Sequence, residues 1–214
     1  MTQATNGELA HALVQLEEQH VATLVSMQLA GGVAPVIILA EMRQGMTEVG
    51  NRFADGTYFL TELIMAATMF GQAMKKIEPQ LTGESSSEGG DVVFATVKGD
   101  IHNLGKDIVV AMLRSAGFRV HDLGVDVPPE RIVEKLNETG AGLLGLSALL
   151  TTSFDSMKAT VQAVEKAGLR DRVKIMVGGG PVDERVCAFV GADAYGHDVH
   201  DAIGLARQLA TLEV

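Results

Sequence analysis

Residues 91–106 read DVVFATVKGDIHNLGK and contain the change of pattern that decides the fold. The first seven residues form a mostly apolar run with three valines, which predicts a strand buried on both faces. Small and polar residues at 98–103 then predict a loop. From residue 104 to 115 apolar residues recur at helical spacing, and Gly117 predicts the end of that helix. A buried strand, a loop and a helix are therefore expected in immediate succession.

The same succession recurs along the rest of the chain. Further strands are predicted at 118–124, 142–147, 172–179 and 192–196. Helices are predicted from Pro128–Pro129 to before Gly140, at 153–167, briefly before residue 192, and at 200–212. Strands that alternate with helices are typical of a doubly wound parallel sheet. We expect an α/β domain with a five-stranded, flavodoxin-like (Rossmann-like) sheet of order 2-1-3-4-5 and a ligand at the carboxyl ends of strands 1 and 3.

The chain before residue 85 has a different pattern. Its apolar residues keep helical spacing, with interruptions at Gly31–Gly32 and Gly56 and an end at Pro79. Four helices are predicted, which is typical of a small bundle. The run TGESSSEGG at 82–90 has no apolar side chain and predicts a linker. We expect a four-helix bundle at 1–84, a linker at 85–90 and the α/β domain at 91–214.

Composition excludes several classes of protein. The 214 residues carry 17 basic and 27 acidic side chains, a net charge of −10, which disfavours a nucleic-acid binder. A single cysteine, Cys187, excludes an internal disulfide and a multi-cysteine metal site. No apolar run has the length of a membrane span, and the N-terminus lacks the pattern of a secretory signal. We expect a cytoplasmic protein that contacts neither nucleic acid nor membrane.

Three loops, 98–106, 146–153 and 178–181, are predicted to meet at the carboxyl edge of the sheet. Their glycines do not fit a P-loop, because five residues rather than four separate Gly99 from Gly105 and an acid, Asp107, follows Lys106. No dinucleotide fingerprint follows the first strand, and the glycines at 178–180 precede a proline. The sequence therefore disfavours both nucleotide sites.

The pair Asp100-x-His102 is the remaining chemical feature of this edge. A carboxylate that holds one imidazole nitrogen fixes the tautomer and raises the basicity of the other, as in many metal sites. The alternative is that His102 only caps the helix or bonds its neighbours. No zinc-like cluster of His, Cys or carboxylates accompanies the pair in the sequence. A single protein ligand suits a metal whose equatorial ligands come from a macrocycle.

These motifs resemble the cobalamin-binding signature of corrinoid proteins. The resemblance is carried by GDIHNLG (99–105), SAL (147–149), GG (179–180) and GADAY (191–195). VGNRFADGTYFL (49–60) and LIMAA (63–67) also resemble the helical cap of methionine synthase and of the small corrinoid methyl carriers. The chain departs from the family pattern at Asn103, where Asp is frequent, and at Thr61, where Pro is frequent.

The resemblance implies a role for each matching residue. His102 would be the lower axial ligand of cobalt, with Asp100 on its other nitrogen and Ser147 extending that relay. The displaced nucleotide tail of the cofactor would lie in a slot through the domain. The residues implied in cofactor binding are Gly99, Asp100, Ile101, His102, Asn103, Gly105, Ser147, Leu149, Thr151, Gly179 and Gly180, with Phe59 and Leu63 of the cap over the upper face.

The resemblance further implies a methyl-carrying subunit that is not catalytically complete alone. A donor-specific methyltransferase would load the cobalt of cobalamin, and a second methyltransferase would pass the methyl group to a thiol or to tetrahydrofolate. A reductive activator of Co(II) is a further possible partner. Methoxy-aromatics, methanol, methylamines and betaines stay open as donors. The alternatives are a cobalamin-dependent sensor and the small subunit of an adenosylcobalamin mutase.

Overall fold

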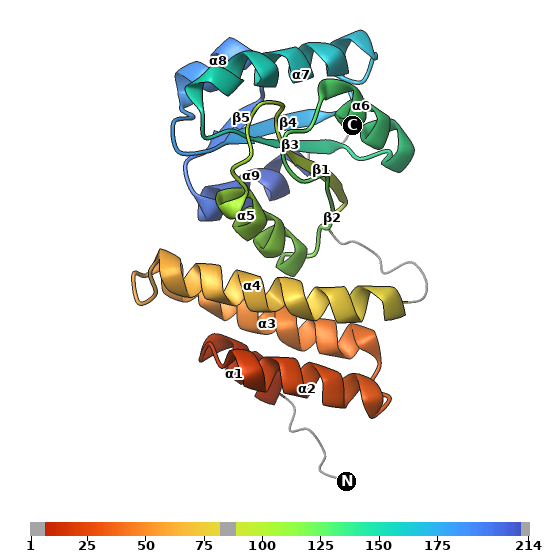
Figure 1. Ribbon diagram of the computed structural model, residues 1–214, viewed down its shortest axis with the longest axis vertical. Helices are drawn as coiled ribbons and strands as arrows, with labels where there is room; N and C mark the ends of the chain where they lie inside the picture. The colour runs from red at the N-terminus through yellow and green to blue at the C-terminus, as the bar shows by residue number, and fades with distance from the viewer. Residues whose placement is uncertain (1–6, 82–88, 211–214) are drawn as a thin grey trace. The chain divides into compact units, whose positions relative to one another are not determined.

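The computed structural model describes residues 7–81 and 89–210 of the chain. These residues form two compact units, a helical one before residue 82 and an α/β one after residue 88 (Figure 1). Most of the predicted linker at 85–90 lies outside the described residues. The domain limits at 84 and 91 therefore stay predictions.

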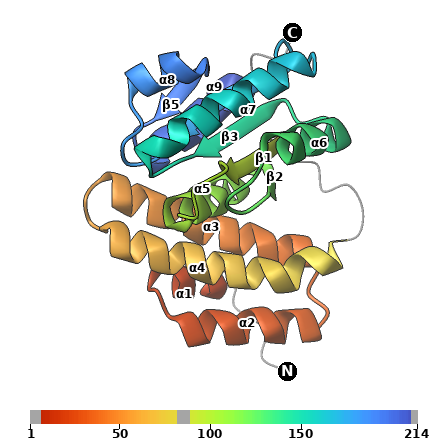
Figure 2. The same ribbon diagram turned by 45° about the horizontal axis from the view of Figure 1, so that its top comes forward.

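The helical unit contains four α-helices within its described part. They are α1 (Glu8–Val14), α2 (Glu18–Ala30), α3 (Pro35–Ala54) and α4 (Leu60–Ile77), followed by a short 3₁₀ helix, η1 (Glu78–Gln80). Figure 2 shows α3 and α4 side by side, with α1 and α2 on one side of them. The predicted four-helix cap is confirmed.

The apolar spacing of α4 explains the packing of the bundle. Buried residues recur at steps of three and four along it: Leu63, Ala66, Phe70, Ala73 and Ile77. That spacing places them on one face of the helix, which packs against α3 and α2. Pro35 occupies the first turn of α3, where its missing N–H costs no hydrogen bond.

The α/β unit has a five-stranded parallel sheet. Its strands are β1 (Asp91–Thr96), β2 (Arg119–Asp122), β3 (Leu143–Ser147), β4 (Lys174–Gly178) and β5 (Ala194–Gly196). They lie in the order β2-β1-β3-β4-β5, which confirms the predicted topology. The connecting helices are α5 (Leu104–Ser115), α6 (Pro129–Thr139), α7 (Phe154–Lys166) after η2 (Thr151–Ser153), α8 (Glu184–Val190) and α9 (Val199–Ala210).

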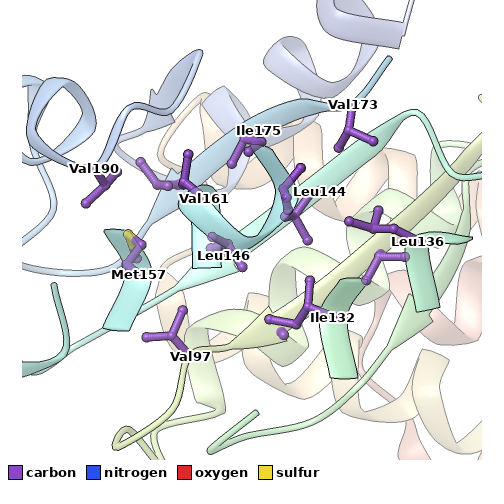
Figure 3. Close-up of a cluster of buried hydrophobic side chains, with 14 of the residues drawn as sticks. Val97, Ile132, Leu136, Leu144, Leu146, Met157, Val161, Val173, Ile175 and Val190 are labelled. Carbon is purple, nitrogen blue, oxygen red and sulfur yellow. The ribbon is translucent and has the colours of Figure 1, made fainter. Parts of the chain in front are cut away.

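Helices cover both faces of this sheet: α6, α7 and α8 lie on one face, and α5 and α9 on the other (Figure 1). Between the sheet and α6–α8 lies a core of aliphatic side chains, including Leu144, Leu146, Ile132, Met157 and Val161 (Figure 3). This burial fixes the strands and thereby the loops at their ends. Within the described residues, no helix is both long and apolar enough to cross a lipid bilayer.

Candidate functional site

The register of the sheet aligns the ends of its three central strands. Thr96 of β1 pairs with Ser147 of β3, which pairs with Gly178 of β4. The loops that follow these residues, 97–103, 148–150 and 179–183, therefore leave the sheet at one edge. The structure brings together there the loop residues singled out in the sequence.

The carboxylate of Asp100 joins two of these loops. Its Oδ1 lies 2.8 Å from Nδ1 of His102 and accepts the backbone N–H of His102 at 3.0 Å. Its Oδ2 accepts the backbone N–H groups of Leu149 at 2.6 Å and Leu150 at 2.9 Å. Both oxygens are therefore fully engaged, one in its own loop and one in the loop after β3.

These hydrogen bonds keep Asp100 ionised although its side chain is inaccessible to solvent. Burial alone would raise the pKa of the carboxyl. The backbone N–H groups of His102 and Leu150, the imidazole of His102 and the N–H of Leu149 outweigh that effect and lower the pKa to about 2. Asp100 is thus a fixed negative charge at neutral pH.

An ionised carboxylate only accepts hydrogen bonds, so the proton of neutral His102 lies on Nδ1. Nε2 then carries the lone pair. No described residue hydrogen-bonds to Nε2, and the imidazole side chain is 48% exposed. The pair therefore presents one oriented, basic nitrogen at the edge of the sheet.

The lowered pKa of Asp100 predicts how the stability of the fold depends on pH. Because the pKa falls from 3.8 to about 2 on folding, the ionised carboxylate stabilises the fold by on the order of 2 kcal/mol above pH 4. That contribution is lost as the pH falls from about 4 towards 2, and about half is lost by pH 3. Urea unfolding measures the free energy of unfolding of the wild type and of Asp100→Asn at pH 7 and at pH 3. The difference between the two proteins should be smaller at pH 3. The same difference at both pH values would contradict the lowered pKa of Asp100.

Most of the other predicted residues of the α/β unit lie in the loops at this edge of the sheet. Four apolar side chains of these loops and of the start of α5 are exposed: Ile101 at 73%, and less fully Leu104, Leu149 and Leu150. Gly99 and Asn103 lie in the same loop as His102, and Gly105 lies in the first turn of α5, where a methyl group would meet no atom. Thr151 begins η2, and Gly180 lies beside the side chain of Leu149.

The structure gives the contacts or the burial of three further predicted residues. Oδ2 of Asp100 accepts the backbone amides of Leu149 and Leu150, and among the described residues no hydrogen bond joins the Ser147 hydroxyl to Asp100. Leu63 is fully buried on the inward stripe of α4, so it has no free surface to offer a cofactor. Phe59, at the N-terminus of α4, is 71% exposed and retains such a surface.

Sequence reasoning assigned no role at the site to Thr96, or to Lys106 and Asp107 of α5. The buried Thr96 hydroxyl donates to the carbonyl of His102 at 3.0 Å. Asn103 donates to Asp107 at 2.8 Å, and Lys106 donates to Asp107 and to Asp122 of β2, each at 2.6 Å. Thr96 could have been found as the one hydroxyl in a mostly apolar strand.

The fold also gathers a cluster that the sequence did not predict. His197, Asp198 and Asp201 place ligand atoms within 4.8 Å of one another at the start of α9, all exposed. Asp198 accepts the backbone N–H of Asp201 at 2.9 Å, and Asp201 accepts that of His197 at 3.3 Å. These bonds satisfy the start of the helix and account for the arrangement.

The edge fits a flat cofactor that brings its own metal. An oriented nitrogen and exposed apolar side chains share this edge of the sheet with the exposed, side-chain-free backbone of Gly179 and Gly180. Fold and site together define a corrinoid-binding α/β domain accompanied by a four-helix cap.

Comparison with known proteins agrees with this class. A family model described as a B12 binding domain matches residues 90–203, and a second of the same description matches residues 6–78. The chain is 40% identical over 206 residues to the dimethylamine corrinoid protein of Methanosarcina barkeri, covering 94% of this chain and 95% of that protein. It is 38% identical over 199 residues to trimethylamine corrinoid protein 1 of Methanosarcina acetivorans, covering 92% of each.

Solved structures are similar over nearly the whole chain. A cobalamin-binding protein from Desulfitobacterium hafniense DCB-2 is 37% identical, with a TM-score of 0.66 and coverage of 97% of this chain and 99% of that one. The methanol:cobalamin methyltransferase complex MtaBC from Methanosarcina barkeri contains a chain that is 26% identical, with a TM-score of 0.80 and coverage of 96% and 79%. The chain belongs to the family of small corrinoid proteins, and its cofactor is cobalamin or a related corrinoid.

Proposed function

We propose that this chain carries a methyl group on the cobalt of a bound corrinoid between two methyltransferases. The observation that carries the proposal is the Asp100–His102 pair, whose oriented Nε2 has no hydrogen-bond partner among the described residues. When bound, the corrinoid supplies a cobalt ion that accepts and releases the methyl group. His102 is the proposed lower ligand of that ion.

The protein residues give this ligand a fixed direction. Asp100 holds the imidazole through Nδ1, and the amides of Leu149 and Leu150 hold Asp100. A carboxylate behind a ligating histidine raises its basicity and keeps the ring from rotating. The exposed side chains of Ile101, Leu104 and Leu149 provide apolar surface around the ligand for the macrocycle. The proposed contacts of the nucleotide tail are Ser147, Leu149, Thr151, Gly179 and Gly180.

The proposed methyl donor is a methylated amine. This choice is supported by the relatives named dimethylamine and trimethylamine corrinoid proteins, which are 36–42% identical to this chain. The proposed partners are an amine-specific methyltransferase and a second methyltransferase whose acceptor is a thiol or tetrahydrofolate. A reductive activator would restore the cofactor after accidental oxidation. The structure of MtaBC, a complex of a related chain, supports the existence of such a partner.

The test is reconstitution with separate donors. The corrinoid-loaded protein, reduced chemically, is mixed in turn with a methyltransferase specific for dimethylamine, trimethylamine, monomethylamine or methanol, each together with its own substrate. Methylation of the bound cofactor is followed by its electronic spectrum. We expect transfer from a methylated amine and none without the methyltransferase. Transfer from methanol with a methanol-specific partner, and from no amine, would contradict the proposed donor.

A further inference from the structure

The loop at 97–103, which carries the proposed cobalt ligand His102 and is called the ligand loop below, is hydrogen-bonded to a second loop. Residues 123–128 connect β2 to α6 and run beside β1, to which they are hydrogen-bonded three times. Leu123 N–H donates to the Phe94 carbonyl, Thr96 N–H to the Gly124 carbonyl and Val127 N–H to the Thr96 carbonyl. These three hydrogen bonds fix the position of loop 123–128 beside the end of β1.

Asp126, in loop 123–128, makes two hydrogen bonds to the ligand loop. Its Oδ1 accepts the backbone N–H of Gly99 at 2.7 Å, and its own backbone N–H donates to the carbonyl of Asp100 at 2.9 Å. The two bonds enclose the peptide group between Gly99 and Asp100. They bracket the residue whose carboxylate orients His102.

The backbone of Asp126 adopts a conformation that a side chain seldom takes. Its φ is +54°, in the left-handed region, where Asp and Asn are tolerated better than other residues with a Cβ. Such a conformation persists where surrounding contacts over-determine it, and it concentrates at functional sites. Here the contacts that fix it are the two bonds to the ligand loop and the bonds of its neighbours to β1.

We infer that Asp126 is a positioning residue for the cobalt ligand, acting through the Gly99–Asp100 backbone rather than by touching the cofactor. This inference rests on the proposed role of His102. Asp126 sets where Asp100 stands, and Asp100 sets the direction of the imidazole. Loss of the Asp126 carboxylate should loosen the loop and weaken coordination of cobalt by His102 while the sheet stays folded.

Two substitutions of Asp126 separate its side-chain hydrogen bond from its backbone conformation, and a third, at another acid, is the control. Asp126→Asn keeps an acceptor oxygen and tolerance of the left-handed region. Asp126→Gly relieves the backbone but removes the acceptor, so it should fold even if Asp126→Ala does not. Asp171→Ala, an exposed acid that precedes β4 at the opposite edge of the sheet, is the matched control.

The first readout needs no cofactor. Amide hydrogen exchange of Gly99 in the apo protein should accelerate by about 2- to 10-fold in Asp126→Gly, the effect of losing one hydrogen bond. The second readout is the dissociation constant for cobalamin and the share of bound cobalamin coordinated by protein nitrogen. In Asp126→Gly the affinity should fall by about 2- to 10-fold. Asp126→Asn should lie near the wild type, and Asp171→Ala should match it.

The outcomes distinguish this inference from the proposed function. Wild-type exchange and wild-type coordination in Asp126→Gly would overturn the role of Asp126 alone. Faster exchange of the Gly99 amide with unchanged coordination of cobalt would show that Asp126 stabilises the backbone around Gly99 without affecting His102. That result would also overturn the inference. A wild-type protein whose bound cobalamin lacks a histidine ligand would overturn the proposed function itself, and with it any role of Asp126 towards cobalt.

Discussion

Replacing His102 with alanine is expected to weaken the binding of cobalamin by about 10- to 100-fold and to abolish coordination of cobalt by protein nitrogen. Loss of groups that hold or orient a metal ligand has effects of that size. The fold should persist, because the imidazole is half-exposed and Asp100 keeps its three bonds from backbone N–H groups. Equilibrium dialysis with hydroxocobalamin measures the affinity, and circular dichroism checks the fold.

Two controls make this result specific to the ligand. Free imidazole should restore a nitrogen ligand to the His102→Ala protein and part of the lost affinity. His20→Ala removes an exposed imidazole from helix α2 of the cap and should bind cobalamin like the wild type. Unchanged affinity and an unchanged spectrum in His102→Ala would contradict the assignment of the ligand.

The second large effect is expected for Gly179→Ala. A Cβ built at Gly179 would lie 1.9 Å from the carbonyl oxygen of Ala148 and 2.8 Å from its carbon, and the φ of Gly179 is +133°. Neither the backbone of Ala148 nor that dihedral angle can adapt at small cost. The loop after β3 would have to move, and with it the amides of Leu149 and Leu150 that hold Asp100. We expect a loss of more than about 4 kcal/mol in the free energy of unfolding.

Gly180→Ala is the matched control for this substitution. A Cβ there would approach only the side-chain end of Leu149, at 3.1 Å, which can turn away. Its expected cost is about 1 kcal/mol or less. Urea unfolding of the apo proteins measures both. Similar stabilities for the two variants would show that the close approach of Gly179 to Ala148 is relaxed in solution.

The sequence pattern predicted the fold well where the signal was local. Residues 104–115 were predicted as a helix with the limits that α5 has, because Gly117 and the helical spacing mark both its face and its end. The strands were predicted too long: 172–179 instead of Lys174–Gly178, and 118–124 instead of Arg119–Asp122. A strand ends where its neighbour stops offering hydrogen bonds, and that limit belongs to the pairing of strands rather than to either sequence.

The sequence predicted the pairing of Asp100 with His102 but not the long-range contacts that hold this pair. The spacing of Asp100 and His102 indicated their pairing, since both lie in one short loop. Asp126 forms its bond with Gly99 across 27 positions of the chain, and no motif in the sequence links the two residues. Likewise, the choice between the Ser147 hydroxyl and the amides of Leu149 and Leu150 depends on how the loop turns after β3. Such long-range contacts leave no periodic signal.

The most direct test of the central claim is the electron paramagnetic resonance spectrum of cobalamin bound as Co(II) to protein labelled with ¹⁵N-histidine. The splitting of the cobalt lines reports the nuclear spin of the axial nitrogen. If His102 is the lower ligand, the label should change each triplet into a doublet, and His102→Ala should show no such change. Triplets that persist in the labelled wild type would place the cofactor's own benzimidazole on cobalt and contradict the account.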